Sequence, residues 1–264
     1  MILIDGKKIR DEILVKVKNE VASLSFKPIF CDVLVGEDVV SKQYVNIKIN
    51  FAKKTGILCH EAFFPANIKE EELIKEIEKI NNLENICGLI IQLPLPLGFN
   101  TKKILGSIRK EIDVDCLNSN LENAPTGKAI FHILDNLNLD LENKNILVIG
   151  AGPLVGTPVA KILEKRGLRF DVVRKETENK YNLIKKADIV ISGAGDPNFI
   201  KGDMIKEGAV LIDAGTSESG SSVAGDVDLE SVKNIAGYVS PVPGGVGPVT
   251  VAMLLNNVLK VAKK

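Results

Sequence analysis

Two periods of apolar residues alternate along the chain, and each period predicts a different kind of element. Near the N-terminus, Ile9, Ile13, Val17 and Val21 recur every fourth residue, which predicts an amphipathic helix that ends before Pro28. Short continuous apolar runs elsewhere predict buried strands. The chain therefore reads as an exchange of helices and strands rather than as an all-helical or all-strand protein.

In the first half, strands are predicted at 29–35, 57–63 and 86–93, and helices at 39–54 and 69–80. The run that begins at Ile86 is almost wholly apolar, as expected of a parallel strand that is covered on both faces. In the second half, strands are predicted at 145–149, 170–173, 189–191, 210–212 and 235–239, and a final helix at 249–261. Both halves therefore predict an α/β arrangement.

A glycine-rich turn joins the first strand of the second half to a helix. The strand 145–149 runs into Gly-Ala-Gly-Pro-Leu-Val-Gly, and an apolar-periodic helix follows. Such a turn presents backbone N–H groups and the positive end of a helix to a diphosphate. Pro153 suits the first turn of that helix because its missing N–H costs nothing there. The alternative is a tight turn without a ligand. The candidate cofactor-binding residues are Gly150, Ala151, Gly152, Pro153 and Gly156.

The second strand of this half indicates which dinucleotide binds. In NAD sites a carboxylate at the end of this strand bonds the ribose hydroxyls. Here Asp171 lies inside the strand, and the strand ends in Arg174 and Lys175. Two cations suit a 2′-phosphate, so we predict NADP, with a solvated basic turn and NAD as the alternatives. Three glycines after later strands let the backbone approach the cofactor: Gly193, Gly195 and Gly215.

These patterns together predict two α/β domains. Residues 1–119, joined by the C-terminal helix 247–264, form a domain that holds the substrate, and residues 120–246 form a Rossmann-type dinucleotide-binding domain. A cleft between two such domains is a common ligand position. Residues 241–248 read Pro-Val-Pro-Gly-Gly-Val-Gly-Pro between a predicted strand and a helix. A stiff loop in this place is better suited to holding a ligand than to linking free domains.

Composition excludes several classes of function. Lys plus Arg and Asp plus Glu both total 34, so no net field recruits nucleic acid or a membrane surface. The four cysteines and two histidines show no metal-ligand spacing, so no metal is expected. Dispersed cysteines indicate reduced thiols and hence a cytoplasmic protein. The early charges at the N-terminus are unlike a signal peptide, and no segment approaches the length of a membrane span.

The first half also carries residues suited to chemistry. Tyr44 and Lys48 are four residues apart, so they share one face of the predicted helix 39–54. Gln92 follows an apolar strand and precedes Leu-Pro-Leu-Pro, which places it at the carboxyl end of that strand, where α/β sites form. Asp115 closes an Asp-Val-Asp sequence. Each of these features taken alone is more often structural than functional.

In combination, the segments resemble one family over nearly the whole chain, the bifunctional methylenetetrahydrofolate dehydrogenase/methenyltetrahydrofolate cyclohydrolases. The resemblance rests on residues 41–48, 88–96, 113–115, 150–158, 225–228 and 241–250. It implies NADP-dependent oxidation of 5,10-methylenetetrahydrofolate to 5,10-methenyltetrahydrofolate, followed by hydrolysis to 10-formyltetrahydrofolate. It also implies a homodimer, for which an edge strand of the nucleotide domain is a candidate contact surface.

The family's active-site residues fall on Tyr44, Lys48, Gln92 and Asp115. The resemblance implies that Tyr44 stacks on the folate ring system and that Asp115 accepts hydrogen bonds from the pterin. We hypothesise that Lys48, held by Gln92, acts as general base and then as general acid in the hydrolysis. Further candidate substrate-binding residues lie in the proline-glycine loop: Pro243, Gly244 and Gly245.

The chain departs from the family pattern at several positions. Ile112 and Cys116 flank Asp-Val-Asp where Lys and Gly are usual, and the segment 116–126 is shorter than usual. Ala151-Gly152 replaces an Arg-Ser that usually contacts the 2′-phosphate, which leaves the cations at 174 and 175 to carry the preference for NADP.

Two other functions fit parts of this pattern. A monofunctional NAD(P)-dependent methylenetetrahydrofolate dehydrogenase would lack the hydrolysis, but Tyr44, Lys48 and Gln92 are intact. A non-catalytic NADP-binding sensor would have no reason to keep Lys48 or Asp115.

Overall fold

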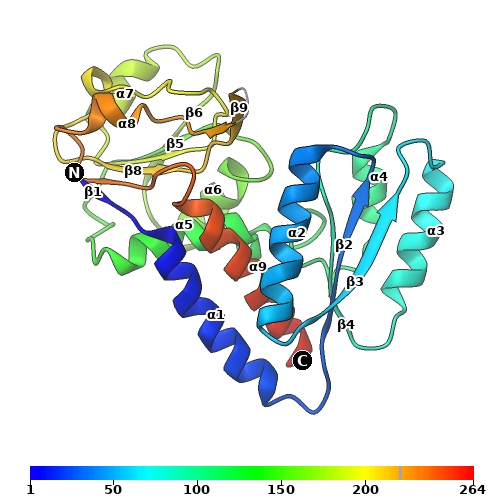
Figure 1. Cartoon of the computed structure of the whole chain (residues 1–264). Coiled ribbons are helices and arrows are strands. Elements are labelled where there is room, and N and C mark those ends of the chain that lie inside the picture. The colour runs from blue at the N-terminus through cyan, green and yellow to red at the C-terminus, as the bar shows by residue number, and fades with distance from the viewer. Residues whose placement is uncertain (220–221) are drawn as a thin grey trace. The chain divides into compact units, whose positions relative to one another are not determined.

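The computed structural model describes residues 1–219 and 222–264 and contains two parallel sheets (Figure 1). The chain divides into two compact units. The six-stranded unit comprises Met1–Arg10 and Thr126–Thr250, and the three-stranded unit comprises Asp11–Pro125 and Val251–Lys264. Two helices contribute residues to both units, α1 (Gly6–Ala22) and α9 (Val246–Ala262). The predicted α/β class is confirmed.

The three-stranded sheet has its first strand in the middle. β2 (Ile29–Val35) pairs with β3 (Leu58–Phe64) on one side and with β4 (Ile86–Ile91) on the other, and both pairings are parallel. Helix α2 (Val39–Lys54) packs on one face of this sheet and α3 (Glu70–Asn81) on the other (Figure 1). Because both faces are covered, every residue of β2 after the first is buried.

Local sequence explains where α2 begins and which face it buries. The Asp38 side chain accepts a hydrogen bond of 2.7 Å from the backbone N–H of Ser41, so it caps the first turn. Val45 and Ile49 of α2 pack against Leu34 of β2. Since positions four apart share a helix face, the same face carries Tyr44 and Lys48 toward the sheet.

Helix α9 belongs mostly to the three-stranded unit, and a buried amide ties it there. The Asn257 side chain donates hydrogen bonds to the backbone oxygens of Val114 (3.0 Å) and Asn123 (2.8 Å). Gly88 of β4 lies directly beneath the helix, because a Cβ at this position would stand 2.7 Å from Cγ2 of Val258. The helix therefore packs on β4 and on the segment that follows it.

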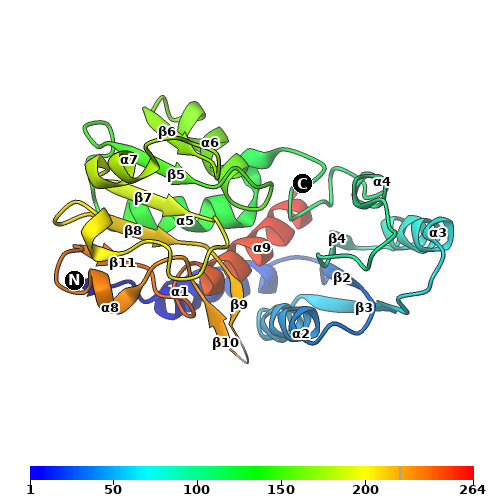
Figure 2. The same cartoon turned by 90° about the horizontal axis from the view of Figure 1, so that it is seen from above.

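The six-stranded sheet is also wholly parallel, in the order β1-β11-β8-β7-β5-β6, and Figure 2 shows the strands from β11 to β6 side by side in this order. Helices α7 (Lys180–Lys186) and α8 (Leu229–Val232) cover one face, and α5 (Pro125–Asn136) and α6 (Gly156–Lys165) lie on the other (Figure 1). The strands are β1 (Ile2–Leu3), β5 (Ile146–Ile149), β6 (Phe170–Val173), β7 (Ile189–Ser192), β8 (Val210–Asp213) and β11 (Tyr238–Val239).

Some elements differ from their predicted bounds. The strand predicted at 235–239 is only two residues long, because its partner β1 is equally short and Ile235 bonds back to Val232 in a turn. The strand predicted at 86–93 ends at Ile91, and α9 begins three residues early, at Val246. The predictions omitted β1, α5, α8, a short helix α4 (Thr101–Gly106) and the strands β9 (Ser217–Ser219) and β10 (Ser222–Ala224).

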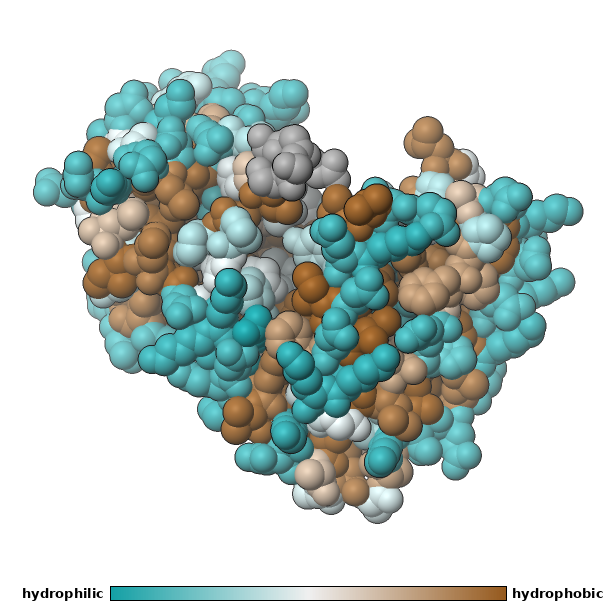
Figure 3. Space-filling view, viewed as in Figure 1, coloured by the Kyte–Doolittle hydropathy of each residue, from teal (hydrophilic) through white to brown (hydrophobic). Residues whose placement is uncertain are grey.

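Strand β3 forms an edge of the three-stranded sheet. Among the described strands it pairs with β2 alone, and Ala62 is its one buried residue. Leu58 and Phe63 are 46% and 52% exposed. Figure 3 shows apolar surface between α2 and α3, over this strand. In the described parts of the chain, no helix combines the length and apolar character needed to cross a membrane.

Candidate functional site

Lys48 of α2 is a buried lysine with two polar partners. Its side chain reaches the sheet, and the residue is only 8% exposed. The Nζ atom donates a hydrogen bond of 2.7 Å to Oε1 of Gln92 and lies 2.7 Å from Oδ2 of Asp32. The ammonium group therefore sits beside the central strand β2 and next to the residue that follows β4.

Gln92 is held at both ends, which fixes the direction of its amide. Its backbone N–H donates to the oxygen of Val33 (2.8 Å), which continues the sheet pairing one residue past β4. Its Nε2 donates to the oxygen of Leu93 (2.6 Å), so that Oε1 is turned toward Lys48. The prolines at 94 and 96 cannot donate to a sheet, which explains why the strand stops here.

Asp115 sits on a turn that Asp113 stabilises. Asp113 bridges to Leu89 beside β4, and its carboxylate accepts hydrogen bonds from the backbone N–H groups of Cys116 (3.0 Å) and Asn118 (2.8 Å). Cys116 has φ of +62°, a left-handed backbone that favours glycine. Glycine would adopt this backbone without the strain that a Cβ brings.

The half-buried Asp115 is electrostatically coupled to the lysine. Burial raises the pKa of Asp115 to about 6, the positive charge of Lys48 works against this rise, and the charges of Asp113 and Asp32 add to it. Tyr44 precedes Lys48 by one helical turn and is also half-buried, and burial raises the pKa of its hydroxyl above the usual value. The structure thus brings Lys48 and Gln92 into contact, and Asp115 lies close enough for the lysine charge to lower its pKa.

The glycine-rich turn of the six-stranded unit follows β5, the strand at which the order of the sheet reverses. Gly150 has φ of +91°, and a Cβ there would lie 2.6 Å from the oxygen of Gly193. A Cβ at Gly156 would lie 2.0 Å from the oxygen of Gly150. Side chains would therefore destroy the turn at both positions. At Gly152 a Cβ would meet nothing within 4 Å, so the turn leaves open space there, as a bound diphosphate requires.

The prediction that Pro153 lies in the first helical turn is wrong. Helix α6 begins at Gly156, and Val155 before it has non-helical φ and ψ of −126° and −70°. The backbone N–H of Thr157 donates to the oxygen of Gly152, so the chain makes a further loop before the helix starts. The longer Gly-x-Gly-x-x-x-Gly spacing accounts for this, and Ala151, Gly152 and Pro153 lie in the loop itself.

The ends of β6 and β7 flank the glycine turn. The backbone N–H of Gly150 donates to the oxygen of Val173, and that of Gly193 donates to the oxygen of Ile149. Arg174 and Lys175 follow β6 directly and are exposed, whereas Asp171 pairs with Leu147 inside the strand. Both cations therefore lie at the carboxyl ends of the strands, as the glycine turn does.

Two buried carboxylates that the sequence analysis did not single out organise the remaining loops at this edge. Asp226 accepts hydrogen bonds from the Ser192 hydroxyl (2.6 Å) and from the backbone N–H groups of residues 194 and 196. Asp213 accepts from the N–H groups of Gly215 (2.9 Å) and Val227 (2.8 Å), and burial raises its pKa to about 6. These bonds fix the loops that contain Gly193, Gly195 and Gly215. The Gly-Asp-Val-Asp sequence at 225–228 was the available signal.

The proline-glycine loop lies in the six-stranded unit, between β11 and α9. The backbone N–H of Gly6, in α1, donates to the oxygen of Gly244 (3.0 Å), and a Cβ at Gly6 would lie 1.8 Å from the oxygen of Gly245. Gly244 has φ of +113°. Pro243, Gly244 and Gly245 are therefore held in a rigid turn against the start of α1.

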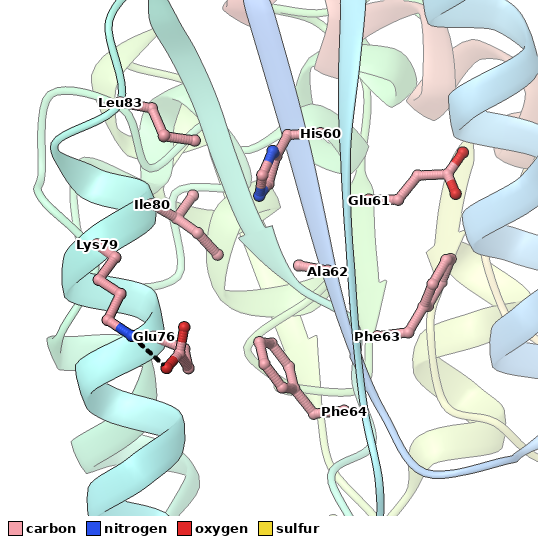
Figure 4. A pocket seen from close by; sticks show the side chains of 9 residues that line it. All are labelled: His60, Glu61, Ala62, Phe63, Phe64, Glu76, Lys79, Ile80 and Leu83. Atoms are coloured by element: carbon pink, nitrogen blue, oxygen red, sulfur yellow. Dashed lines mark hydrogen bonds and ion pairs between the residues drawn. The ribbon is translucent and has the colours of Figure 1, made fainter.

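Asp32 is the site residue that the sequence analysis missed in the three-stranded unit. It stands in the middle of the predicted strand 29–35, where a lone charge within an apolar run was the only signal. A separate hollow lies between β3 and α3, where Figure 4 shows His60 and Phe64 on one wall and Ile80 and Leu83 on the other. It contains none of the predicted site residues.

Comparison with known proteins decides the family. The model "Tetrahydrofolate dehydrogenase/cyclohydrolase, catalytic domain" matches residues 4–115, and the model "Tetrahydrofolate dehydrogenase/cyclohydrolase, NAD(P)-binding domain" matches residues 124–264. The chain belongs to the tetrahydrofolate dehydrogenase/cyclohydrolase family. The predicted resemblance is therefore confirmed, and the glycine turn with its open space at Gly152 lies in the NAD(P)-binding domain of this family.

Individual relatives match over almost their whole length. The bifunctional protein FolD of Nautilia profundicola is 41% identical over 278 residues, which cover 100% of this chain and 98% of the relative. The crystal structure of the bifunctional enzyme FolD from Campylobacter jejuni superposes with a TM-score of 0.94 at 33% identity, covering 99% and 98% of the two chains. The Trypanosoma brucei FolD, complexed with NADP cofactor and inhibitor, gives 0.93 at 31% identity, covering 99% and 97%.

Replacing Gly156 by alanine tests the glycine turn. Because the new Cβ would overlap the oxygen of Gly150, the Gly156→Ala variant should lose about 1–3 kcal/mol of unfolding free energy. It should also bind NADP at least tenfold more weakly by titration calorimetry. Gly106→Ala is the control, since its Cβ would meet nothing within 4 Å. Unchanged NADP affinity in the Gly156 variant would contradict the role of the glycine turn in binding the diphosphate.

Proposed function

We propose that this chain catalyses two consecutive reactions, NADP-dependent oxidation of 5,10-methylenetetrahydrofolate to 5,10-methenyltetrahydrofolate and hydrolysis of that product to 10-formyltetrahydrofolate. The observation that carries the proposal is the buried Lys48, hydrogen-bonded to Gln92 and coupled to Asp115, within the matched catalytic domain. A lysine in this setting is a group that can move a proton.

The three-stranded unit supplies the residues for folate. Tyr44 presents a half-buried aromatic ring, on which the flat folate ring system stacks. Asp115 accepts hydrogen bonds from the pterin amide and amino groups as a carboxylate. Its pKa of about 6 means that it is ionised at neutral pH. Pro243, Gly244 and Gly245, which belong to the six-stranded unit, are proposed as further substrate-binding residues.

The six-stranded unit supplies the residues for NADP. The turn from Gly150 to Gly156 offers backbone N–H groups and the start of α6 to the diphosphate. Arg174 and Lys175 at the end of β6 bind the 2′-phosphate. Asp171 lies inside the strand, too far from its end to bond the ribose hydroxyls as the carboxylate of an NAD site does. When bound, the nicotinamide accepts the hydride from the methylene carbon of the substrate.

Hydrolysis depends on Lys48. The amine takes a proton from the water whose oxygen bonds to the methenyl carbon, and it then returns that proton to the ring nitrogen as the carbon–nitrogen bond breaks. Gln92 holds the Nζ atom in place through Oε1. The second water proton leaves when the hydroxyl on that carbon becomes the formyl carbonyl, so one proton is released to solvent for each cation hydrolysed. The oxidation needs no such transfer, because the folate nitrogens stabilise the cation that forms, so the two reactions make different demands on Lys48.

Replacing Lys48 by methionine separates the two reactions. We expect the Lys48→Met variant to lose about 10²–10⁴-fold in cyclohydrolase rate, because proton transfer is removed, while it keeps measurable dehydrogenase activity. Rates of methenyl consumption and of NADPH formation report the two reactions. Lys54→Met, an exposed position on the same helix, is the control. Equal loss of both activities would show that Lys48 serves binding or folding instead.

The cofactor preference is tested at the end of β6. The double variant Arg174→Ala/Lys175→Ala should lose about tenfold or more in kcat/KM with NADP, since charge-assisted hydrogen bonds to the phosphate contribute about 1.5–3 kcal/mol each. Turnover with NAD should change little. Lys201→Ala removes an exposed charge elsewhere in the same unit and serves as the control. An equal loss with both cofactors would mean that these cations do not read the 2′-phosphate.

We infer that the protein acts in the cytoplasm as a homodimer. The described cysteines are not joined in disulfides, as a reducing compartment allows. For the dimer contact, β3 is better suited than the β6 edge of the nucleotide domain. β3 leaves Leu58 and Phe63 exposed, whereas the edge strand β6 exposes Asp171. An open edge of this kind can pair with a second copy.

The dimer is tested by adding a charge to β3. Sedimentation should give twice the chain mass for the unaltered protein and a shift toward the monomer for Phe63→Glu, because the carboxylate would be buried in the contact. Val15→Glu, at a 59% exposed position of α1, controls for the added charge. A Phe63→Glu protein that stays dimeric would exclude β3 as the contact, and a monomeric unaltered chain would exclude the dimer.

A further inference from the structure

Asp32 is a carboxylate in a place built for an apolar side chain. It lies in the middle of β2, is 2% exposed, and shares its face of the strand with Phe30 and Leu34. Helix α2 packs on this face. Neither carboxylate oxygen has a hydrogen-bond donor within the described residues except through the ion pair, in which Oδ2 lies 2.7 Å from Nζ of Lys48.

This placement is energetically unfavourable without a partner. Transferring a carboxylate from water into a protein interior costs several kcal/mol, and an ion pair recovers this only with good geometry. A buried apolar residue would fill the same position without that penalty. The contact with Lys48 is therefore the feature that explains an aspartate here, and it connects β2 to the proton-transferring group of the proposed hydrolysis.

Few other groups influence the lysine charge. Asp115, with Asp113 behind it, approaches from the turn after α4, and Tyr44 lies one turn earlier on α2. Cys31 and Cys59 lie near Asp32, and burial raises the pKa of both thiols, that of Cys59 to about 11, so they are uncharged at neutral pH. Of the charged groups facing Lys48 in the described chain, Asp32 alone makes an ion pair with it.

We propose that Asp32 is a positioning residue for cyclohydrolase, which holds the Lys48 amine against Gln92 and sets the pH range in which that amine exchanges its proton. The proposal rests on the function of Lys48 proposed above. A carboxylate at 2.7 Å stabilises the protonated lysine, while the cationic methenyl substrate favours the neutral amine. The opposition of the two charges keeps the proton mobile, so that Lys48 can accept it from water and give it back.

The sign of the pH effect follows directly. As a general base, Lys48 must be neutral when water attacks, so the cyclohydrolase rate rises with pH through the point at which the lysine loses its proton. Removing the Asp32 charge destabilises the protonated lysine. The acidic limb of the pH–rate profile should then move to lower pH, by about one to three units, as expected for the loss of an opposite charge at short range.

The experiment compares pH–rate profiles of the full chain. Asp32→Asn should shift the acidic limb of cyclohydrolase kcat to lower pH, with little change in KM and no shift in the dehydrogenase profile. Asp32→Leu, which avoids burying an unpaired amide, should show the same shift and serves if the asparagine variant is unstable. Asp188→Asn, which breaks a 2.6 Å ion pair with Lys206 in the other unit, is the matched control and should leave the profile unchanged.

The outcomes separate this inference from the proposed function. If Lys48→Met abolishes hydrolysis but the acidic limb stays in place in a folded Asp32 variant, Asp32 has only a structural role and the inference is wrong. If Lys48→Met keeps its cyclohydrolase activity, the role of Lys48 is wrong and the inference falls with it. A limb that moves in the Asp32 variants, but not in Asp188→Asn, supports the proposal.

Discussion

A lysine ammonium buried between a helix and a parallel sheet needs partners, and the three-stranded unit is arranged to provide them. Lys48 reaches the sheet because α2 packs Val45 and Ile49 against Leu34 on the same helical face. The order of strands then places Asp32 of β2 and Gln92, just past β4, at its Nζ atom. If the helix were displaced along the sheet, the charge would lose both partners at once. The packing of apolar side chains thus decides the geometry of the polar site.

The same topological constraint operates in both units. Where a parallel strand has neighbours on both sides and the connections to those neighbours run in opposite directions, a gap opens at the carboxyl end of the strand. Side chains and ligands fit into this gap. β2 between β3 and β4 is such a strand, and so is β5 between β6 and β7. Polar groups accordingly accumulate past these ends: Gln92 in one unit, and Gly150 with the β6 cations in the other. The two units therefore place different functional groups at the same kind of position in a parallel sheet.

Whether the sequence alone predicts a structural feature depends on whether the signal for that feature is local. Local signals, such as the glycine turn at 150–156, predicted elements, whereas Tyr44 and Lys48 were proposed as site residues through the family resemblance, because their four-residue spacing alone is more often structural. Asp32 was missed because its role depends on which helix covers β2, and no local sequence pattern predicts that packing. Strand β1 was missed since two residues, paired only with the distant β11, are too short to show a period. The extra loop at Pro153 was missed because the glycine spacing, and not the proline, decides where α6 starts.

The buried ion pair also bears on the balance of stability and activity. Replacing a buried ion pair by well-packed apolar residues is often neutral or stabilising, while removing one member leaves an uncompensated charge. Asp32 and Lys48 therefore do not need each other in order for the sheet and helix to pack, since Leu34, Val45 and Ile49 already supply that contact. What the pair provides is a lysine whose charge is balanced inside the protein before any ligand arrives. A cation such as the methenyl folate can then approach the amine without meeting an unbalanced positive charge, which an apolar residue at position 32 would leave.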